Sequence, residues 1–335
     1  MTDYSALLDL ARIDILEDIR INPTCIKVGG NTWGTLSNFS AVIGKAKSKK
    51  SFLIMIALAA AVKQSEGLIT VEFAKDKDKV LLFDTEQSKF HIQRAVKRIS
   101  YLAGNIHPHN LETYGLRRHP PVTRLAMIEQ CIYDNYDTGL VVIDGIRDLV
   151  TSINDEEQAT MITSKLLKWT EERNIHIIIV LHQNKGDNNA RGHVGSEIIN
   201  KAETVISVSK DPDNKEISNV QVEYARDKEF EPFSFTIDEN GMPAVVENFL
   251  KPEGKKAITP ADVSKEMHGL ILDQIFIFAP NFYYKEFIIQ VKLNFQSKSI
   301  KIGDNKAKEF ITYYMNQGWV EKVEGGKRYP YYKLK

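Results

Sequence analysis

The sequence has 335 residues and a net charge of zero, with 43% hydrophobic and 26% charged residues, which is typical of a globular protein long enough for two domains. Its two cysteines, Cys25 and Cys131, are far apart and in no metal-ligand spacing, which argues against a disulfide framework or a zinc site and favours a reducing, cytoplasmic location. The longest apolar run, residues 52–62, is too short to span a membrane, and the acidic N-terminus does not resemble a secretion signal.

Short apolar runs alternate with helical stretches between residues 40 and 240. The runs predicted to form strands are Ser40–Gly44, Val80–Thr85, Leu140–Asp144, His176–Leu181 and Thr204–Val208. The helices predicted between them are 51–64, 88–103, 121–135 and 156–173. Several runs lack alternation of polar and apolar residues, as expected for strands buried on both faces of a parallel sheet. The sequence therefore predicts an α/β fold with a mostly parallel sheet and helices on both sides.

The rest of the chain predicts an edge hairpin, a linker and a second domain. The runs Val220–Ala225 and Phe233–Ile237 should pair as a hairpin, and the polar residues 251–263 should form a linker. Beyond the linker, the predicted elements are helices at Leu270–Phe278, Lys285–Phe295 and 304–317 and strands at Trp319–Val323 and Lys327–Lys333. Three helices and a terminal hairpin in residues 264–335 are the outline of a winged helix.

Charge is divided unevenly along the chain. Residues 265–335 hold 12 Lys and Arg against 7 Asp and Glu, whereas the preceding residues hold 32 against 37. A basic C-terminal part suggests contact with a polyanion. A solvated basic surface explains the same numbers, so charge alone leaves both interpretations open.

A motif close to a P-loop joins the first predicted strand to the following helix. It matches G-x-x-x-x-G-K-[ST] from Gly44 to Ser51, except that Lys49 replaces the second glycine. The predicted ATP-binding residues are Gly44, Lys45, Ala46, Lys47, Ser48, Lys49, Lys50, Ser51 and Phe52. Backbone N–H groups would surround the phosphates, Lys50 would reach the β- and γ-phosphates, and the Ser51 hydroxyl would bind Mg²⁺. Lys49 can be accommodated only if its backbone keeps ordinary φ/ψ values; the alternative is a lysine-rich loop that binds no nucleotide.

Each of three later predicted strands ends in polar residues. The first run ends in Asp84-Thr85-Glu86, the second in Asp144 and the third in His182-Gln183. A carboxylate at such a strand end can orient and deprotonate a water molecule, and an aspartate after an apolar strand can hold Mg²⁺. Any one of them alone is more often a surface residue, but the series after a P-loop-like turn is much less expected by accident.

This order of motifs resembles the RecA/DnaB superfamily, and within it the RepA-like helicases of plasmids and other mobile elements, over roughly residues 20–240. The resemblance implies that Lys50 and Ser51 bind nucleotide and Mg²⁺. It also implies the roles of catalytic base for Glu86, Walker B acid and metal ligand for Asp144, and γ-phosphate sensor for Gln183.

Two further segments gain a role from the resemblance. The polar segment 184–196 corresponds to a mobile loop that touches single-stranded DNA in RecA-like rings, with Lys185 and Arg191 as phosphate contacts. Arg226, on the first strand of the late hairpin, corresponds to an arginine finger that reaches a neighbouring subunit. The alternatives are a solvent loop with two incidental cations, and an exposed Arg226 paired with Asp227.

The predicted winged helix would present its third helix to the DNA major groove and its hairpin to the backbone. The candidate contacts are Lys306 and Lys308 on the helix, and Lys327 and Arg328 at the tip of the hairpin. Winged helices also serve as protein–protein modules, so that alternative stays open.

The predicted chain thus has a RecA-like ATPase domain at 1–250, with a helical lead-in over about 1–22, a linker at 251–263 and a winged-helix domain at 264–335. The predicted function is a DNA-dependent ATPase that uses ATP and Mg²⁺ and works as a ring, expected to be a hexamer, with single-stranded DNA in its channel. An ATP-gated DNA-binding regulator with little hydrolysis is the alternative. A RecA-like recombinase is a third possibility, although no separate N-terminal DNA-binding or polymerisation domain is evident.

Overall fold

A computed structural model describes residues 4–14, 16, 24–64, 67–74, 76–184, 192–246, 259–277, 279–298, 300, 302–324 and 330–335. The chain divides into two compact units, Met1–Phe249 and Leu250–Lys335, which are treated separately below. Within the described residues, no helix is long and apolar enough to cross a membrane.

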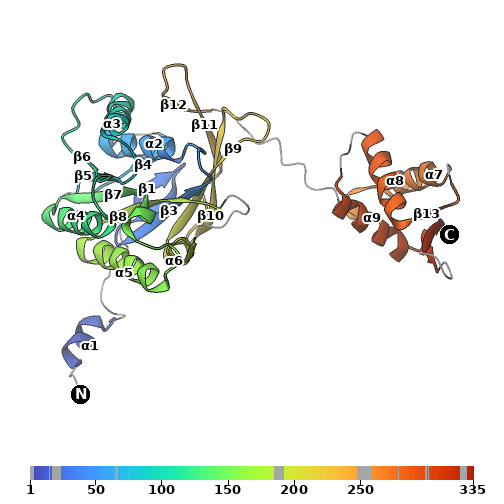
Figure 1. Ribbon diagram of the computed structural model, residues 1–335, viewed down its shortest axis with the longest axis horizontal. Coiled ribbons are helices and arrows are strands. Elements are labelled where there is room, and N and C mark those ends of the chain that lie inside the picture. Colours follow the sequence, from blue (N-terminus) through green and yellow to red (C-terminus); the bar gives the residue numbers. More distant parts are fainter. Residues whose placement is uncertain are drawn as a thin grey trace. The chain divides into compact units, whose positions relative to one another are not determined.

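A nine-stranded sheet in the order β12-β11-β10-β9-β3-β8-β7-β5-β6 forms the centre of the first unit (Figure 1). Its strands are β3 (Asn38–Gly44), β5 (Lys79–Asp84), β6 (Leu111–Gly115), β7 (Thr138–Asp144), β8 (His176–His182), β9 (Thr204–Lys210), β10 (Ser218–Ala225), β11 (Phe233–Ile237) and β12 (Pro243–Val245). The strands from β9 to β6 are parallel, and β10, β11 and β12 extend the sheet antiparallel. The predicted α/β class with a mostly parallel sheet is confirmed.

Helices cover both faces of this sheet (Figure 1). One face carries α2 (Lys50–Lys63) and α3 (Lys89–Ala103), and the other carries α4 (Pro121–Asp134), α5 (Glu156–Arg173) and α6 (Gly192–Lys201). Successive residues of one strand enter the two cores in turn: Val142 packs on the α2 side, and Val141 and Ile143 pack on the other side. Because both faces are covered, the strands are apolar throughout, which explains the missing polar alternation.

Several elements were not predicted from the sequence. They include a small sheet of β1 (Thr24–Val28), β2 (Asn31–Thr35) and β4 (Ile69–Val71), the edge strands β6 and β12, and the short 3-10 helix η1 (Ile146–Leu149), whereas α1 (Ser5–Ala11) lies within the predicted helical lead-in. The prediction of a loop over 184–196 is wrong at its end, because α6 begins at Gly192. Val194 and Ile198, spaced by one helical turn, are buried against the sheet. Tertiary packing therefore stabilises a helix where the polar composition had predicted a loop.

A buried polar network joins the small sheet to the large one. The Trp33 indole donates to the Ser40 hydroxyl at 3.1 Å, and that hydroxyl lies 2.9 Å from Nε2 of His176. Nδ1 of His176 lies 2.8 Å from the Thr35 carbonyl, which can only accept, so the proton is on Nδ1 and the ring is neutral. Burial lowers the pKa of His176 to about 4. A Cβ at position 34 would lie 2.1 Å from this ring, which explains Gly34.

Stability is expected to fall as the pH drops from about 6.5 towards 4. The unfolded chain takes up a proton on His176 near its ordinary pKa of about 6.5, whereas the folded chain resists until about pH 4, so acid favours unfolding, by on the order of 3 kcal/mol. Urea unfolding at pH 7, 6 and 5 checks this. His176→Gln should show a shallower decrease than the wild-type chain, and replacement of the exposed His109 by Gln should not. Parallel pH profiles for the wild-type and His176→Gln chains would contradict the assignment.

The second unit contains three helices and a three-stranded sheet in the order β13-β15-β14. Its elements are α7 (Lys265–Phe276), β13 (Asn281–Tyr283), α8 (Tyr284–Ser297), α9 (Asp304–Asn316), β14 (Val320–Val323) and β15 (Tyr331–Leu334), preceded by the 3-10 helix η2 (Pro260–Asp262). Phe287, Phe295 and Phe310 form part of its core. The helices lie close to their predicted places, and β13 is an addition.

The end of the predicted linker belongs to the second unit. Thr259 and Asp262 cap η2 reciprocally, and the buried His268 lies 3.0 Å from the Pro260 carbonyl. Residues 259–263 are therefore ordered against α7, whereas residues 251–258 of the predicted linker lie outside the described part of the chain.

Candidate nucleotide-binding site

The predicted strand-end residues meet at the carboxyl ends of the parallel strands of the large sheet. Because β3, β5, β7 and β8 are parallel, their last residues lie together: Gly44 pairs in register with His182, and Asp84 with Asp144. The loop of residues 45–49 leaves β3 at these ends and leads into α2, whose N-terminus points its free backbone N–H groups into the same space. Gly44 is required there, because a Cβ would lie 2.4 Å from the Val208 carbonyl oxygen.

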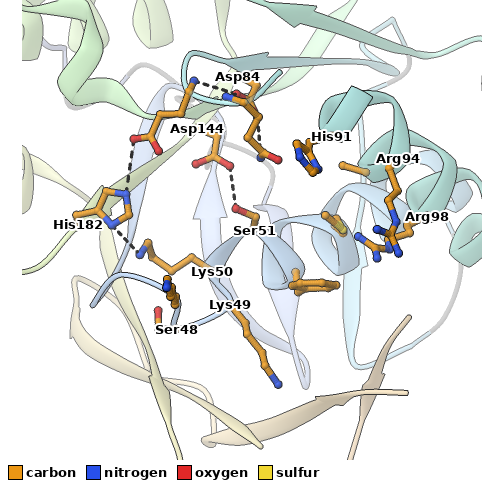
Figure 2. A pocket seen from close by; sticks show the side chains of 16 residues that line it. Ser48, Lys49, Lys50, Ser51, Asp84, His91, Arg94, Arg98, Asp144 and His182 are labelled. Carbon is orange, nitrogen blue, oxygen red and sulfur yellow. Dashed lines mark hydrogen bonds and ion pairs between the residues drawn. The ribbon is translucent and has the colours of Figure 1, made fainter. Parts of the chain in front are cut away.

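Lys49 departs from what the sequence led us to expect. Its backbone has φ 71° and ψ 26°, in the left-handed region that glycine normally occupies in this motif, so the expectation of ordinary φ/ψ values is wrong. The side chain extends away from Ser51 (Figure 2), and its amine donates to the Glu216 carbonyl at 2.6 Å. Burial lowers the pKa of Lys49, helped by nearby Lys210. The loop thus keeps the shape of a P-loop at the expense of local strain.

Lys49→Gly is expected to be more stable than Lys49→Ala by about 1 kcal/mol. Both variants lose the bond to Glu216, but only glycine removes the left-handed strain. Urea unfolding of the two variants measures the difference. Nucleotide affinity should change by no more than about twofold in Lys49→Gly, because the Lys49 amine extends away from Ser51 and is bonded to the Glu216 carbonyl. Equal stability of the two variants would show that position 49 carries no strain.

Lys50 is the central cation of the site. It is 5% exposed, and its amine donates to the carbonyls of Gly44 at 2.8 Å and Lys45 at 3.2 Å. The amine also donates to Nδ1 of His182 at 3.2 Å, which leaves the imidazole proton on Nε2. Burial lowers the pKa of Lys50 to about 8, and the carboxylates of Asp144 and Glu86 oppose the shift. A bound phosphate would stabilise the charged amine further.

Three carboxylates, each in a distinct environment, line the same pocket as this lysine. Asp144 accepts a hydrogen bond from the Ser51 hydroxyl at 3.1 Å (Figure 2), and burial raises its pKa to about 6 with help from Asp84. Glu86 lies 3.6 Å from Nε2 of His182, and this contact lowers the pKa of the carboxyl. Asp84 accepts from the backbone N–H groups of residues 86 and 87 and so shapes the turn that presents Glu86.

The donor set fits Mg²⁺ held together with phosphate. The Ser51 hydroxyl and the Asp144 carboxylate are hard oxygen donors 3.1 Å apart, and no described group of three or more His, Cys, Asp or Glu residues forms a self-sufficient metal site. In the loop itself, the buried Ser48 hydroxyl finds no hydrogen-bond partner within the described chain. An orphaned polar atom in a phosphate loop fits a site built for an additional polar ligand. Ser51 and Asp144 are the residues that would hold the ion.

The pocket continues from the P-loop along α3, with a volume of about 450 Å³. Its far end is lined by Phe52 and by His91, Arg94 and Arg98 on α3 (Figure 2), and the Arg98 guanidinium lies 5.2 Å from the Phe52 ring centre. An apolar floor with cations at its rim suits the base and sugar of a nucleotide. The three α3 residues were not predicted, although their spacing of three and four residues places them on one helix face.

Two predicted catalytic residues lie outside this pocket. The backbone N–H of Gln183 donates to the Gly44 carbonyl at 3.1 Å, and it is His182 whose side chain contacts both Lys50 and Glu86. Arg226 follows β10 at the opposite strand ends of the sheet, where Ala225 pairs with Thr204. Its guanidinium is exposed and donates to the Lys201 carbonyl, and no ion pair with Asp227 occurs within the described residues.

The predicted DNA contacts are only partly described. Lys185, Arg191, Lys327 and Arg328 lie outside the described residues. On α9, Lys306 forms an ion pair with Glu309 at 2.6 Å, which reduces its availability to a phosphate. Lys308 is exposed and forms no ion pair with any described residue.

A phosphate loop on the central strand, a Ser51–Asp144 pair and a glutamate at a neighbouring strand end are together the arrangement expected of a P-loop ATPase core. Residues 22–188 match the family described as an AAA domain, a group of P-loop ATPases with a RecA-like fold. No curated protein matches the chain. The matched segment contains every residue of the pocket and ends before α6, so it covers neither Arg226 nor the second unit.

Proposed function

We propose that this protein is a DNA-dependent ATPase that works as an oligomer, of the type of the RepA-like replicative helicases or replication factors of plasmids and mobile elements. The observation that carries the proposal is the convergence of Lys50, the Ser51–Asp144 pair and Glu86 in one pocket. Such a set is what phosphoryl transfer from ATP to water needs, because catalysis there consists mainly of positioning and charge stabilisation.

Each residue has a distinct task in the proposed hydrolysis. The loop N–H groups and Lys50 would bind the β- and γ-phosphates, and Ser51 and Asp144 would hold Mg²⁺, which would neutralise charge on the phosphates. Glu86 orients the attacking water and accepts its proton, for which its lowered pKa keeps it ionised. His182 positions Glu86 through Nε2 while its Nδ1 accepts from Lys50.

Oligomerisation is proposed because of Arg226. Arg226 follows β10 at the strand ends opposite to the P-loop, so its exposed guanidinium is outside its own chain's nucleotide pocket. A role as arginine finger therefore requires a second subunit. Sizing of the full chain with ATP and Mg²⁺ tests this: a hexamer, lost or weakened without nucleotide, is expected, and a monomer at micromolar concentration with full ATPase activity would refute it.

The second unit is proposed to be a winged helix that binds duplex DNA. Its order of helix, strand, two helices and two strands supports this reading, and Lys308 faces solvent on the third helix. Because Lys306 is paired with Glu309, the helix offers few free cations, and a protein-binding role for this unit is the competing outcome.

An ATP-gated DNA-binding regulator is the second candidate, favoured by the strained lysine at position 49. Steady-state ATP hydrolysis, measured with and without single-stranded DNA, separates the two. Several-fold stimulation by DNA is expected for the ATPase. Turnover at background level in both conditions, with ATP still bound, would favour the regulator.

A further inference from the structure

A band of exposed cations lies beside the nucleotide pocket, at the same carboxyl ends of the parallel strands. Glu86 lies between this band and the pocket. A cavity of about 540 Å³ is lined by Thr85, Glu86, Asp148 and His182 together with Arg117, Arg124 and Arg147. A neighbouring groove of about 1150 Å³ is lined by Arg117, Arg118, Lys89 and Phe90, beside the edge strand β6. Arg117 lines both hollows, and the exposed residues along them are called here the basic band: Lys89, Phe90, Arg117, Arg118 and Arg147.

Arg124 lines the first cavity, but its guanidinium is bonded to the protein itself. Its guanidinium donates to the carbonyls of Arg117 at 3.0 Å, His119 at 2.7 Å and Asp148 at 3.3 Å. It also lies 3.5 Å from the Asp148 carboxylate. The loop that carries Arg117 is therefore tied to η1, which carries Arg147, and the donors of Arg124 are used by the protein itself.

The cations of the band, unlike Arg124, are not engaged in hydrogen bonds or ion pairs of this kind with any described residue. Lys89, Arg117, Arg118 and Arg147 are exposed, and within the described chain none of them forms an ion pair or a side-chain hydrogen bond. They gather in a part of the sequence that is acidic on balance, since the residues before 265 hold 32 Lys and Arg against 37 Asp and Glu. Phe90 lies among them with 67% of its surface exposed.

We propose that the basic band binds single-stranded DNA, with backbone phosphates on Arg117, Arg118 and Arg147 and a base stacked on Phe90. Free cations along a groove with an exposed aromatic ring are the chemistry by which proteins bind single strands without reading sequence. This inference rests on the proposed function, because it assigns the DNA partner of that ATPase to residues of the core.

The band is linked to the catalytic base through a short chain of contacts. Thr85, the residue before Glu86, places its hydroxyl 3.1 Å from the Asp148 carboxylate and 3.0 Å from the Gly145 carbonyl. Asp148 is in turn held by Arg124, which positions Arg117. A Cβ on Gly145 would lie 2.1 Å from that hydroxyl, so only glycine permits this contact. A strand bound on the band would therefore contact residues that are bonded to the segment presenting Glu86.

Fluorescence anisotropy of a labelled oligothymidylate with the full chain tests the proposal. For Arg117→Ala/Arg118→Ala, the slope of log affinity against log salt should become shallower by about 1.4, because about 0.7 is lost per phosphate contact with a single strand. Phe90→Ala should weaken binding by about fivefold or more with an unchanged salt slope, and Phe90→Trp should restore it. Duplex DNA binding should not change in any of these variants.

The matched control is Lys63→Ala/Lys97→Ala, which removes two exposed cations that line neither hollow. Binding of a fluorescent ATP analogue confirms that each variant is folded. The proposal is overturned if the arginine variant keeps the affinity and salt slope of the control. It is also overturned if the variant binds DNA normally but changes the size of the oligomer, which would make the band an interface between copies.

The two proposals fail in different ways. If DNA binding depends on the band but no ATP is hydrolysed with or without DNA, the proposed ATPase fails and the band stands. If ATP is hydrolysed with DNA stimulation that is the same in the arginine variant and in the control, the band fails and the ATPase stands.

Discussion

Lys50→Ala is expected to weaken ATP binding by about 100-fold or more and to abolish hydrolysis. A lysine that donates charge-assisted hydrogen bonds to phosphates contributes on the order of 3 kcal/mol, and no other described cation lies as deep in the pocket. Titration with a fluorescent ATP analogue measures the loss. The substitution also removes the bonds to the Gly44 and Lys45 carbonyls, so the free energy of unfolding is measured in parallel.

Lys63→Ala is the matched control for this variant. Lys63 lies in the last turn of α2, its side chain is exposed, and it does not line the pocket. We expect a change of affinity of about twofold or less. Equal affinities for Lys50→Ala and Lys63→Ala, with both chains folded, would mean that the loop is a lysine-rich turn and not a phosphate-binding site.

Glu86→Gln is expected to retain ATP binding while lowering the hydrolysis rate by about 10²- to 10⁴-fold, the range for loss of a general base. The amide keeps the size of the side chain but cannot accept the proton of water. Single-turnover hydrolysis and analogue binding, measured on the same preparation, separate the two effects. The proposed chemistry needs the rate to fall while the affinity stays.

Glu72→Gln is the control for this second variant, since Glu72 is an exposed carboxylate paired with Lys27 away from the pocket. Its hydrolysis rate should equal that of the wild-type chain. If Glu86→Gln also hydrolysed ATP at the wild-type rate, another group would have to serve as base, and Asp84 is the nearest described carboxylate on the same turn.

The candidate site was predicted best where it depended on residue type and order along the chain. Lys50, Ser51, Glu86 and Asp144 were assigned from strand ends and a loop motif, and the structure brings all four to one pocket. The assignment of the sensor was less exact, because His182 and Gln183 are adjacent and only the strand register shows which side chain turns towards Lys50 and Glu86.

The sequence pattern did not predict the local conformation where tertiary packing overrides the intrinsic preference of the residues. Nothing in the residue type at position 49 indicates a left-handed lysine, because such a conformation persists only when the surrounding loop holds it. The helix α6 was missed because its first turn contains glycines and polar residues, while the burial of Val194 and Ile198 stabilises it.

By itself the sequence determined the α/β class, the parallel strands and the residues of the phosphate loop, because apolar periodicity and strand-end carboxylates are local features of the chain. Tertiary structure alone decided which distant side chains meet. It placed His91, Arg94 and Arg98 beside the P-loop, and Arg226 at the opposite strand ends. It also gathered Lys89, Arg117 and Arg147 into one band, since cations far apart in sequence become neighbours only through the order and register of the strands that carry them.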